Sequence, residues 1–225
     1  MGFAIINRNE IIDEEIKKIF SKSFEINQKL FGQKPKKFDI IICDTEKEFK
    51  KQAKYYYFKW GTATVLRNNN LITRSPDFVE KIGRWNKSDF QNLMNHEMNH
   101  VFWMDFYGLT KPCWLLEGLA CYVGKNFLLS KNDIRELIDK YQVNDDILDY
   151  RYLERNFKNG HYPRYPVWAN FTDFISKKYS AKQLVEAMNR YIKNPNLSNY
   201  KKSFKKIFGK SDKDLFKEFL KYIKS

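Results

Sequence analysis

Two histidines four residues apart constrain this chain more than any other feature of its sequence. They are His96 and His100, in the stretch NHEMNHVFW at 95–103, and Glu97 directly follows the first of them. The chain of 225 residues has 3 histidines in all, so most of its imidazole groups stand in this one motif. Residues four apart on an α-helix fall within about 40 degrees of each other, so both rings could reach one metal ion.

The residues around the motif predict that it lies in the middle of a helix. Ser88 and Gln91 form a capping box ahead of it, and Gly108 is suited to end the helix after it. Glu97 is then turned away from the ion, yet it stays near enough to reach a water molecule on the metal. The motif therefore predicts two imidazole ligands and a candidate general base.

Two imidazoles alone hold zinc weakly, and a catalytic site normally takes a third protein ligand. The downstream candidates are Asp105, Cys113, Glu117 and Cys121. Asp105 comes five residues after His100, about 140 degrees round the same helix, which points it away from the ion. Glu117 is a lone carboxylate in the apolar helix predicted from WLLEGLACYV, where burial without a cation would be costly. We therefore expect Glu117 as the third ligand and the two cysteines as unreactive thiols.

The rest of the chain predicts an α+β fold. The β-branched run at 37–43 is a predicted strand, and 62–67 with 71–74 form a predicted edge hairpin around three asparagines. Beyond residue 130 the pattern is helical throughout. We expect a single domain over 1–225, with an α/β lobe at about 1–125 and a helical lobe at about 126–225. Predicted helix starts lie at Asp13, Thr45, Ser75, Pro112, Ser130, Pro166, Ser180 and Ser211.

HEMNH followed by WLLEGLACYV resembles the gluzincin branch of the zinc metallopeptidases, which includes thermolysin-like and aminopeptidase-N-like enzymes. The resemblance is closest to small variants whose second motif reads W-L-x-E-G-x-A. It implies a zincin fold with a small mixed sheet, one Zn²⁺ per chain and hydrolysis of peptide bonds. It also implies that His96, His100 and Glu117 bind the zinc and that Glu97 is the general base.

The resemblance continues more weakly over residues 38–222. It aligns Tyr165 with the tyrosine that stabilises the oxyanion in the family, with Tyr162 as the second candidate and His161 as the third. All three lie in HYPRYP, a Pro-rich segment that is predicted to be non-helical and to lead into the next helix. One departure is Cys121. It stands four residues after the ligand glutamate, where the family often has an acidic residue that braces a ligand.

Composition leaves one alternative open. The formal net charge is +14, and the lysines are scattered along the chain, as expected of a solvated surface. The same charge would suit an anionic partner, so the alternative to a peptidase is a basic, nucleic-acid-associated protein with a structural or vestigial zinc site. Without added domains or an amine-binding acidic motif, an endopeptidase acting on protein or short peptides is favoured over an aminopeptidase.

The cysteines and the N-terminal residues bear on location. Three cysteines at irregular spacing do not suit a secreted disulfide framework and indicate reduced thiols. The first 15 residues lack the features of a signal peptide, and no apolar run approaches the length of a membrane span. The sequence therefore predicts a soluble, cytoplasmic protein.

Overall fold

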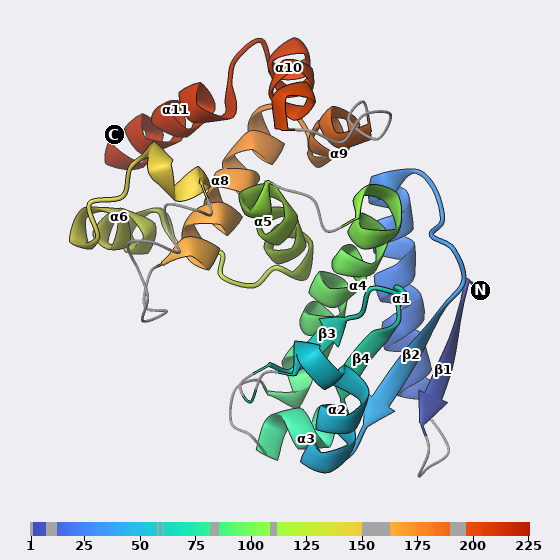
Figure 1. The fold of residues 1–225 in the computed structure, drawn as a ribbon. Helices are drawn as coiled ribbons and strands as arrows, with labels where there is room; N and C mark the ends of the chain where they lie inside the picture. The colour runs from blue at the N-terminus through green and yellow to red at the C-terminus, as the bar shows by residue number, and fades with distance from the viewer. Residues whose placement is uncertain are drawn as a thin grey trace. The chain divides into compact units, whose positions relative to one another are not determined.

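Contacts divide the chain into two compact units, Met1–Phe106 and Tyr107–Ser225. The computed structural model describes residues 2–7, 13–57, 59, 61–81, 86–108, 112–149, 163–189 and 197–225 (Figure 1). The fold is α+β, mostly helical with one small mixed sheet, in agreement with the predicted class. Within these residues, no helix has both the length and the apolarity that crossing a bilayer requires.

The sheet of the first unit has the strand order β1-β2-β4-β3. β1 (Phe3–Asn7) and β2 (Phe38–Cys43) pair in parallel, as do β2 and β4 (Leu71–Arg74). β3 (Ala63–Val65) pairs antiparallel with β4 and closes the predicted hairpin at the sheet edge. Asn69 in its turn has a φ of 69°, the left-handed conformation that asparagine tolerates. The strand β1 was not predicted.

Helix α1 (Glu14–Phe31) contacts both the sheet and helix α4 (Phe90–Tyr107). Asp13 caps it as predicted, because its side chain accepts a hydrogen bond from the Glu15 amide at 3.0 Å. The Phe24 ring lies 6.4 Å from the Phe38 ring of β2 and 5.3 Å from the Phe102 ring of α4. Aromatic packing thus holds α4, the helix that carries both motif histidines, on the α1 side of the sheet.

Helix α2 (Glu46–Ala53) covers the other face of the sheet (Figure 1). Its Phe49 and Ala53 are buried with Cys43 and Ile72 of the strands. The helix begins after Thr45, as predicted, and the Thr45 hydroxyl accepts a hydrogen bond from the Glu48 amide. A short helix, α3 (Pro76–Lys81), follows β4.

Arg74, the last residue of β4, is fully buried. Its guanidinium forms an ion pair with Glu46 at 2.7 Å and donates hydrogen bonds to the backbone carbonyls of Gly61 and Lys59. It also lies 4.2 Å from the centre of the Phe49 ring. One cation therefore joins the start of α2 to the segment that leads into β3.

The second unit is entirely helical over the residues described. Trp114 of α5 (Cys113–Gly124) lies 5.0 Å from Phe171 of α8 (Arg164–Lys178), which in turn lies 4.9 Å from Phe216 of α11 (Asp212–Lys224). Trp168 of α8 donates a hydrogen bond to the Ile147 carbonyl at 3.0 Å. These aromatic residues form a core around α8. The helices are α5 (Cys113–Gly124), α6 (Lys131–Lys140), α8 (Arg164–Lys178), α9 (Ala181–Asn189), α10 (Leu197–Phe208) and α11 (Asp212–Lys224).

Most predicted helix starts are confirmed, and two are corrected. Side chains of Ser130, Ser180 and Ser211 accept hydrogen bonds from the amides three residues on. The box at Ser88 was expected to open α4 directly, but a short 3₁₀ segment, Lys87–Asp89, comes first. Helix α8 begins at Arg164 and not at Pro166.

Candidate metal centre

The two motif histidines lie on one face of α4, in the middle of the helix as predicted. Their Nε2 atoms are 3.0 Å apart, and the ring planes are almost perpendicular, at 86°. His96 is buried and His100 is half-buried. Gly108, with a φ of 69°, ends the helix one residue after Tyr107. Uninterrupted helical geometry from 90 to 107 therefore keeps the two imidazoles in register.

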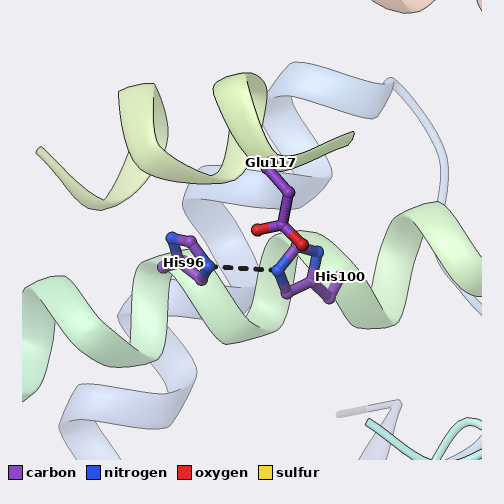
Figure 2. Close-up of side chains that lie close together, drawn as sticks. All are labelled: His96, His100 and Glu117. Atoms are coloured by element: carbon purple, nitrogen blue, oxygen red, sulfur yellow. Dashed lines mark hydrogen bonds between the residues drawn. The ribbon is translucent and has the colours of Figure 1, made fainter. Parts of the chain in front are cut away.

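Glu117 joins these histidines in one group. Each of the three residues offers one ligand atom, and the three atoms all lie within 4.8 Å of one another. Figure 2 shows the Glu117 carboxylate, carried by α5, directed toward the histidine pair on α4. The three residues that the sequence analysis proposed as ligands are thus the ones that the structure brings together as a group able to hold a metal ion.

The donor set fits zinc. Ligand atoms at the usual Zn–N distance of about 2.0 to 2.1 Å in a tetrahedral site lie about 3.3 Å from each other. The two Nε2 atoms, at 3.0 Å, are close to that separation. Two imidazoles and one carboxylate also match the ligand set of catalytic zinc sites that leave one position for water.

The other candidate ligands lie elsewhere. Asp105 accepts a hydrogen bond from the Lys36 amide at 2.9 Å, in agreement with the prediction that it points away from the ion. Cys121 is buried and Cys113 is half-buried. Among the residues described, neither cysteine belongs to a group of three or more potential metal ligands.

Tyr165 lies in the first turn of α8, so the prediction that it stands on a non-helical approach is wrong. Its ring stacks on Phe127 at 5.5 Å and meets Trp168 edge-on at 6.1 Å. Burial, together with the negative charge of Glu117, raises the pKa of the Tyr165 hydroxyl well above its ordinary value, while the Arg164 guanidinium opposes the shift. The hydroxyl therefore stays protonated at neutral pH and can act as a hydrogen-bond donor.

The remaining predicted residues can be placed only in part. Glu97 is half-buried on α4, one residue after His96. Tyr162 and His161, the other candidates for the tyrosine role, lie outside the described residues. The roles proposed for all three stay predictions.

One residue that supports the site was not predicted. Gly118 follows Glu117 on α5, and a β-carbon at this position would lie 2.9 Å from the Trp168 carbonyl oxygen of α8. Only glycine lets the two helices approach this closely. The signal in the sequence was a glycine inside an otherwise apolar helix.

Comparison with known proteins adds no assignment to this geometry. No family model matches the sequence, and no curated protein matches it. The functional argument therefore rests on the three-residue group itself, a possible metal centre made of His96, His100 and Glu117.

Proposed function

We propose that this protein is a zinc-dependent peptidase of the gluzincin type, with an endopeptidase activity favoured. The observation that carries the proposal is the convergence of His96, His100 and Glu117, with ligand atoms within 4.8 Å of one another. The adjacent Glu97 completes the residue set that hydrolysis of a peptide bond needs. A zinc ion held here would lower the pKa of a water molecule to about 7 and polarise the substrate carbonyl.

The residues of the chain supply the proton transfers and the remaining charge stabilisation. In the proposed mechanism, Glu97 accepts a proton from the attacking water and then delivers it to the leaving amine. Tyr165 donates a hydrogen bond to the oxyanion of the tetrahedral intermediate. Removing a single donor of this kind typically costs about 3 to 4 kcal/mol of transition-state stabilisation. β3, at the sheet edge, would bind the substrate main chain as an added strand.

The test of the metal centre is the zinc content of the purified protein, measured by plasma mass spectrometry. We expect about one zinc per chain in the wild type and much less in Glu117→Ala, because two imidazoles alone hold zinc weakly. Glu25→Ala, which removes an exposed glutamate of α1, is the matched control and should keep its zinc. A wild type that takes up no zinc from excess would refute the proposal.

The test of the reaction is digestion of a peptide library, with the products read by mass spectrometry. Internal cleavage that stops when zinc is chelated and returns when zinc is restored would support an endopeptidase. Release of single N-terminal residues alone would show that the favoured endopeptidase activity is wrong, while leaving a zinc peptidase in place.

A second candidate function rests on the surface of α10. Lys201, Lys202, Lys205 and Lys206 are all exposed on this helix, whose apolar face is buried through Tyr200, Phe204 and Phe208. A row of exposed cations of this kind suits a phosphate backbone. Retention of the protein on immobilised DNA at low salt, lost in Lys201→Glu/Lys205→Glu, would favour this alternative.

A further inference from the structure

A line of buried polar side chains joins α1 to α4 on the side of α4 next to the histidines. We call it the α1–α4 polar seam. Three of its members have no exposed surface, Asn95 is 5% exposed and Gln91 is half-buried. Its residues are Ser23 and Asn27 of α1 and Gln91, Asn95 and Asn99 of α4.

Hydrogen bonds connect every member of the seam. Ser23 donates to the Asn95 side-chain oxygen at 2.8 Å, and Asn99 donates to the Asn27 side-chain oxygen at 2.8 Å. The Asn27 amide also donates to the Asn95 backbone carbonyl at 3.1 Å. Gln91 donates to both Ser23, at 2.8 Å, and Asn95, at 2.9 Å. Ser23 and Asn27, four residues apart on α1, thus pair with Asn95 and Asn99, four residues apart on α4.

Apolar packing alone leaves the rotation of α4 poorly specified. Its buried apolar residues are distributed around the whole helix and do not form one stripe. A helix of this kind can turn about its axis and still bury apolar surface. Directional hydrogen bonds with fixed partners remove that freedom, because a rotation would leave buried amides without partners. The buried apolar residues are Phe90, Leu93, Met94, Met98, Val101, Phe102, Trp103 and Tyr107.

The seam is tied to the histidines by position. Asn95 immediately precedes His96, and Asn99 immediately precedes His100, so each histidine follows a seam residue by about 100 degrees round the helix. Zinc sites tolerate deviations of only about 0.2 Å in ligand distance. Fixing the rotation of α4 at two adjacent turns therefore fixes the direction of both imidazoles.

We propose that the α1–α4 polar seam positions His96 and His100 for metal binding, so that Ser23, Asn27, Asn95 and Asn99 are positioning residues of the metal centre. This inference rests on the proposed function, because it supposes that the group binds zinc. It differs from a purely stabilising role, since replacing a buried polar pair by apolar side chains of similar shape is often neutral or stabilising.

The test is the double variant Asn27→Leu/Asn99→Leu, which removes one pair of the seam without leaving a buried amide alone. We expect the melting temperature to stay close to that of the wild type and the dissociation constant for zinc to rise about 10- to 100-fold, as when the supporting partners of metal ligands are lost. Zinc affinity is measured by competition with a chromophoric chelator. Ser203→Ala, a buried polar-to-apolar change in the second unit, is the control and should alter neither quantity.

A second variant keeps the test decisive if the first does not fold. Exchanging the other pair, as Ser23→Asn/Asn95→Ser, keeps one hydroxyl and one amide in the seam, whereas Asn95→Ser alone leaves two short hydroxyls. We expect the exchange to restore zinc affinity that Asn95→Ser loses. Wild-type affinity in the leucine variant or in Asn95→Ser would overturn the inference while the proposed function stands. Zinc loss that merely tracks a fall in melting temperature would also overturn it, and a wild type without zinc removes both proposals.

Discussion

A β-carbon at position 118 would lie 2.4 Å from the Thr172 hydroxyl oxygen, so Gly118 and Thr172 mark a point where the Thr172 side chain of α8 fills the space over the Gly118 backbone of α5. We expect Gly118→Ala to destabilise the protein by about 1 to 3 kcal/mol, because a methyl group there forces the helices apart. Glu117 is the neighbouring residue, so zinc affinity should fall as well. Denaturant unfolding and chelator competition measure the two effects.

Relief of the contact gives the control for this prediction. The Thr172 hydroxyl has no hydrogen-bond partner within the described part of the chain, so Thr172→Ala alone should be tolerated. Combined with Gly118→Ala, it removes the nearest clashing atom and should recover part of the lost stability. Strict additivity of the two changes would contradict a steric explanation.

The proposed general base predicts a separation of metal binding from turnover. Glu97→Gln keeps the shape of the side chain and lies outside the ligand group, so we expect zinc content to stay at the wild-type level. Turnover should fall at least about 100-fold, the lower end of what a positioned general base contributes. Glu25→Gln serves as the matched control. An active Glu97→Gln protein would exclude the proposed mechanism.

Replacing Arg74 should cause a large loss of stability in the first unit. Arg74→Met keeps the apolar contact with Phe49 but removes the ion pair with Glu46 and the donors to the Gly61 and Lys59 carbonyls. We expect a loss of about 2 to 4 kcal/mol in the free energy of unfolding. Glu46→Gln keeps an acceptor but leaves the buried guanidinium without its counter-charge, so it should also be destabilising. A negligible loss in Glu46→Gln would show that the carbonyl contacts, and not the ion pair, hold Arg74.

The contribution of Asp212 to stability should depend on pH with a defined sign. Burial raises the pKa of its carboxyl above the ordinary value of 3.8. The folded protein therefore binds this proton more readily than the unfolded chain, and ionised Asp212 opposes folding at neutral pH. That opposition is lost as the pH falls through the folded-state pKa. Asp212→Asn should be more stable than the wild type at pH 7, with the difference closing toward pH 4 in denaturant titrations.

Asp214, two residues on, is a control of opposite sign. Hydrogen bonds from Ser211 lower the pKa of its carboxyl, so its contribution to stability is present above pH 3.8 and is lost as the pH falls through the lowered value. Asp214→Asn should therefore be less stable than the wild type at pH 7. A difference of the same sign in the two variants would contradict this account.

Local signals in the sequence predicted the elements that depend on local interactions. Asp13 begins α1 as expected and a left-handed Gly32 ends it, since a capping side chain and a glycine act on adjacent backbone groups. The start of α8 was placed two residues late, because Pro163 and Pro166 both suit the first turn of a helix. Strand β1 was missed because five residues are too few to give a clear strand pattern, and its pairing partner β2 begins 35 positions after Phe3.

The same distinction applies to the metal centre. The direction of His96 and His100 follows from helical spacing, so it could be predicted. Glu117 could be proposed because a lone carboxylate in an apolar helix needs a partner. The contacts of Gly118 and the seam could not be predicted, because each depends on which distant helix packs there. Asn95 and Asn99 look like ordinary polar residues until Ser23 and Asn27 are placed opposite them.

The pairing of α1 with α4 also bears on the order of folding. Ser23 and Asn95 are separated by 72 positions, and closing a chain segment of that length costs about 4 kcal/mol in chain entropy. The histidine pair is local to α4, so we expect it to form with the helix, and we expect the long-range contacts that orient the helix to form later. Removing hydrogen bonds between α1 and α4 should therefore raise the unfolding rate more than it lowers the refolding rate, and the two arms of a chevron plot would measure both rates.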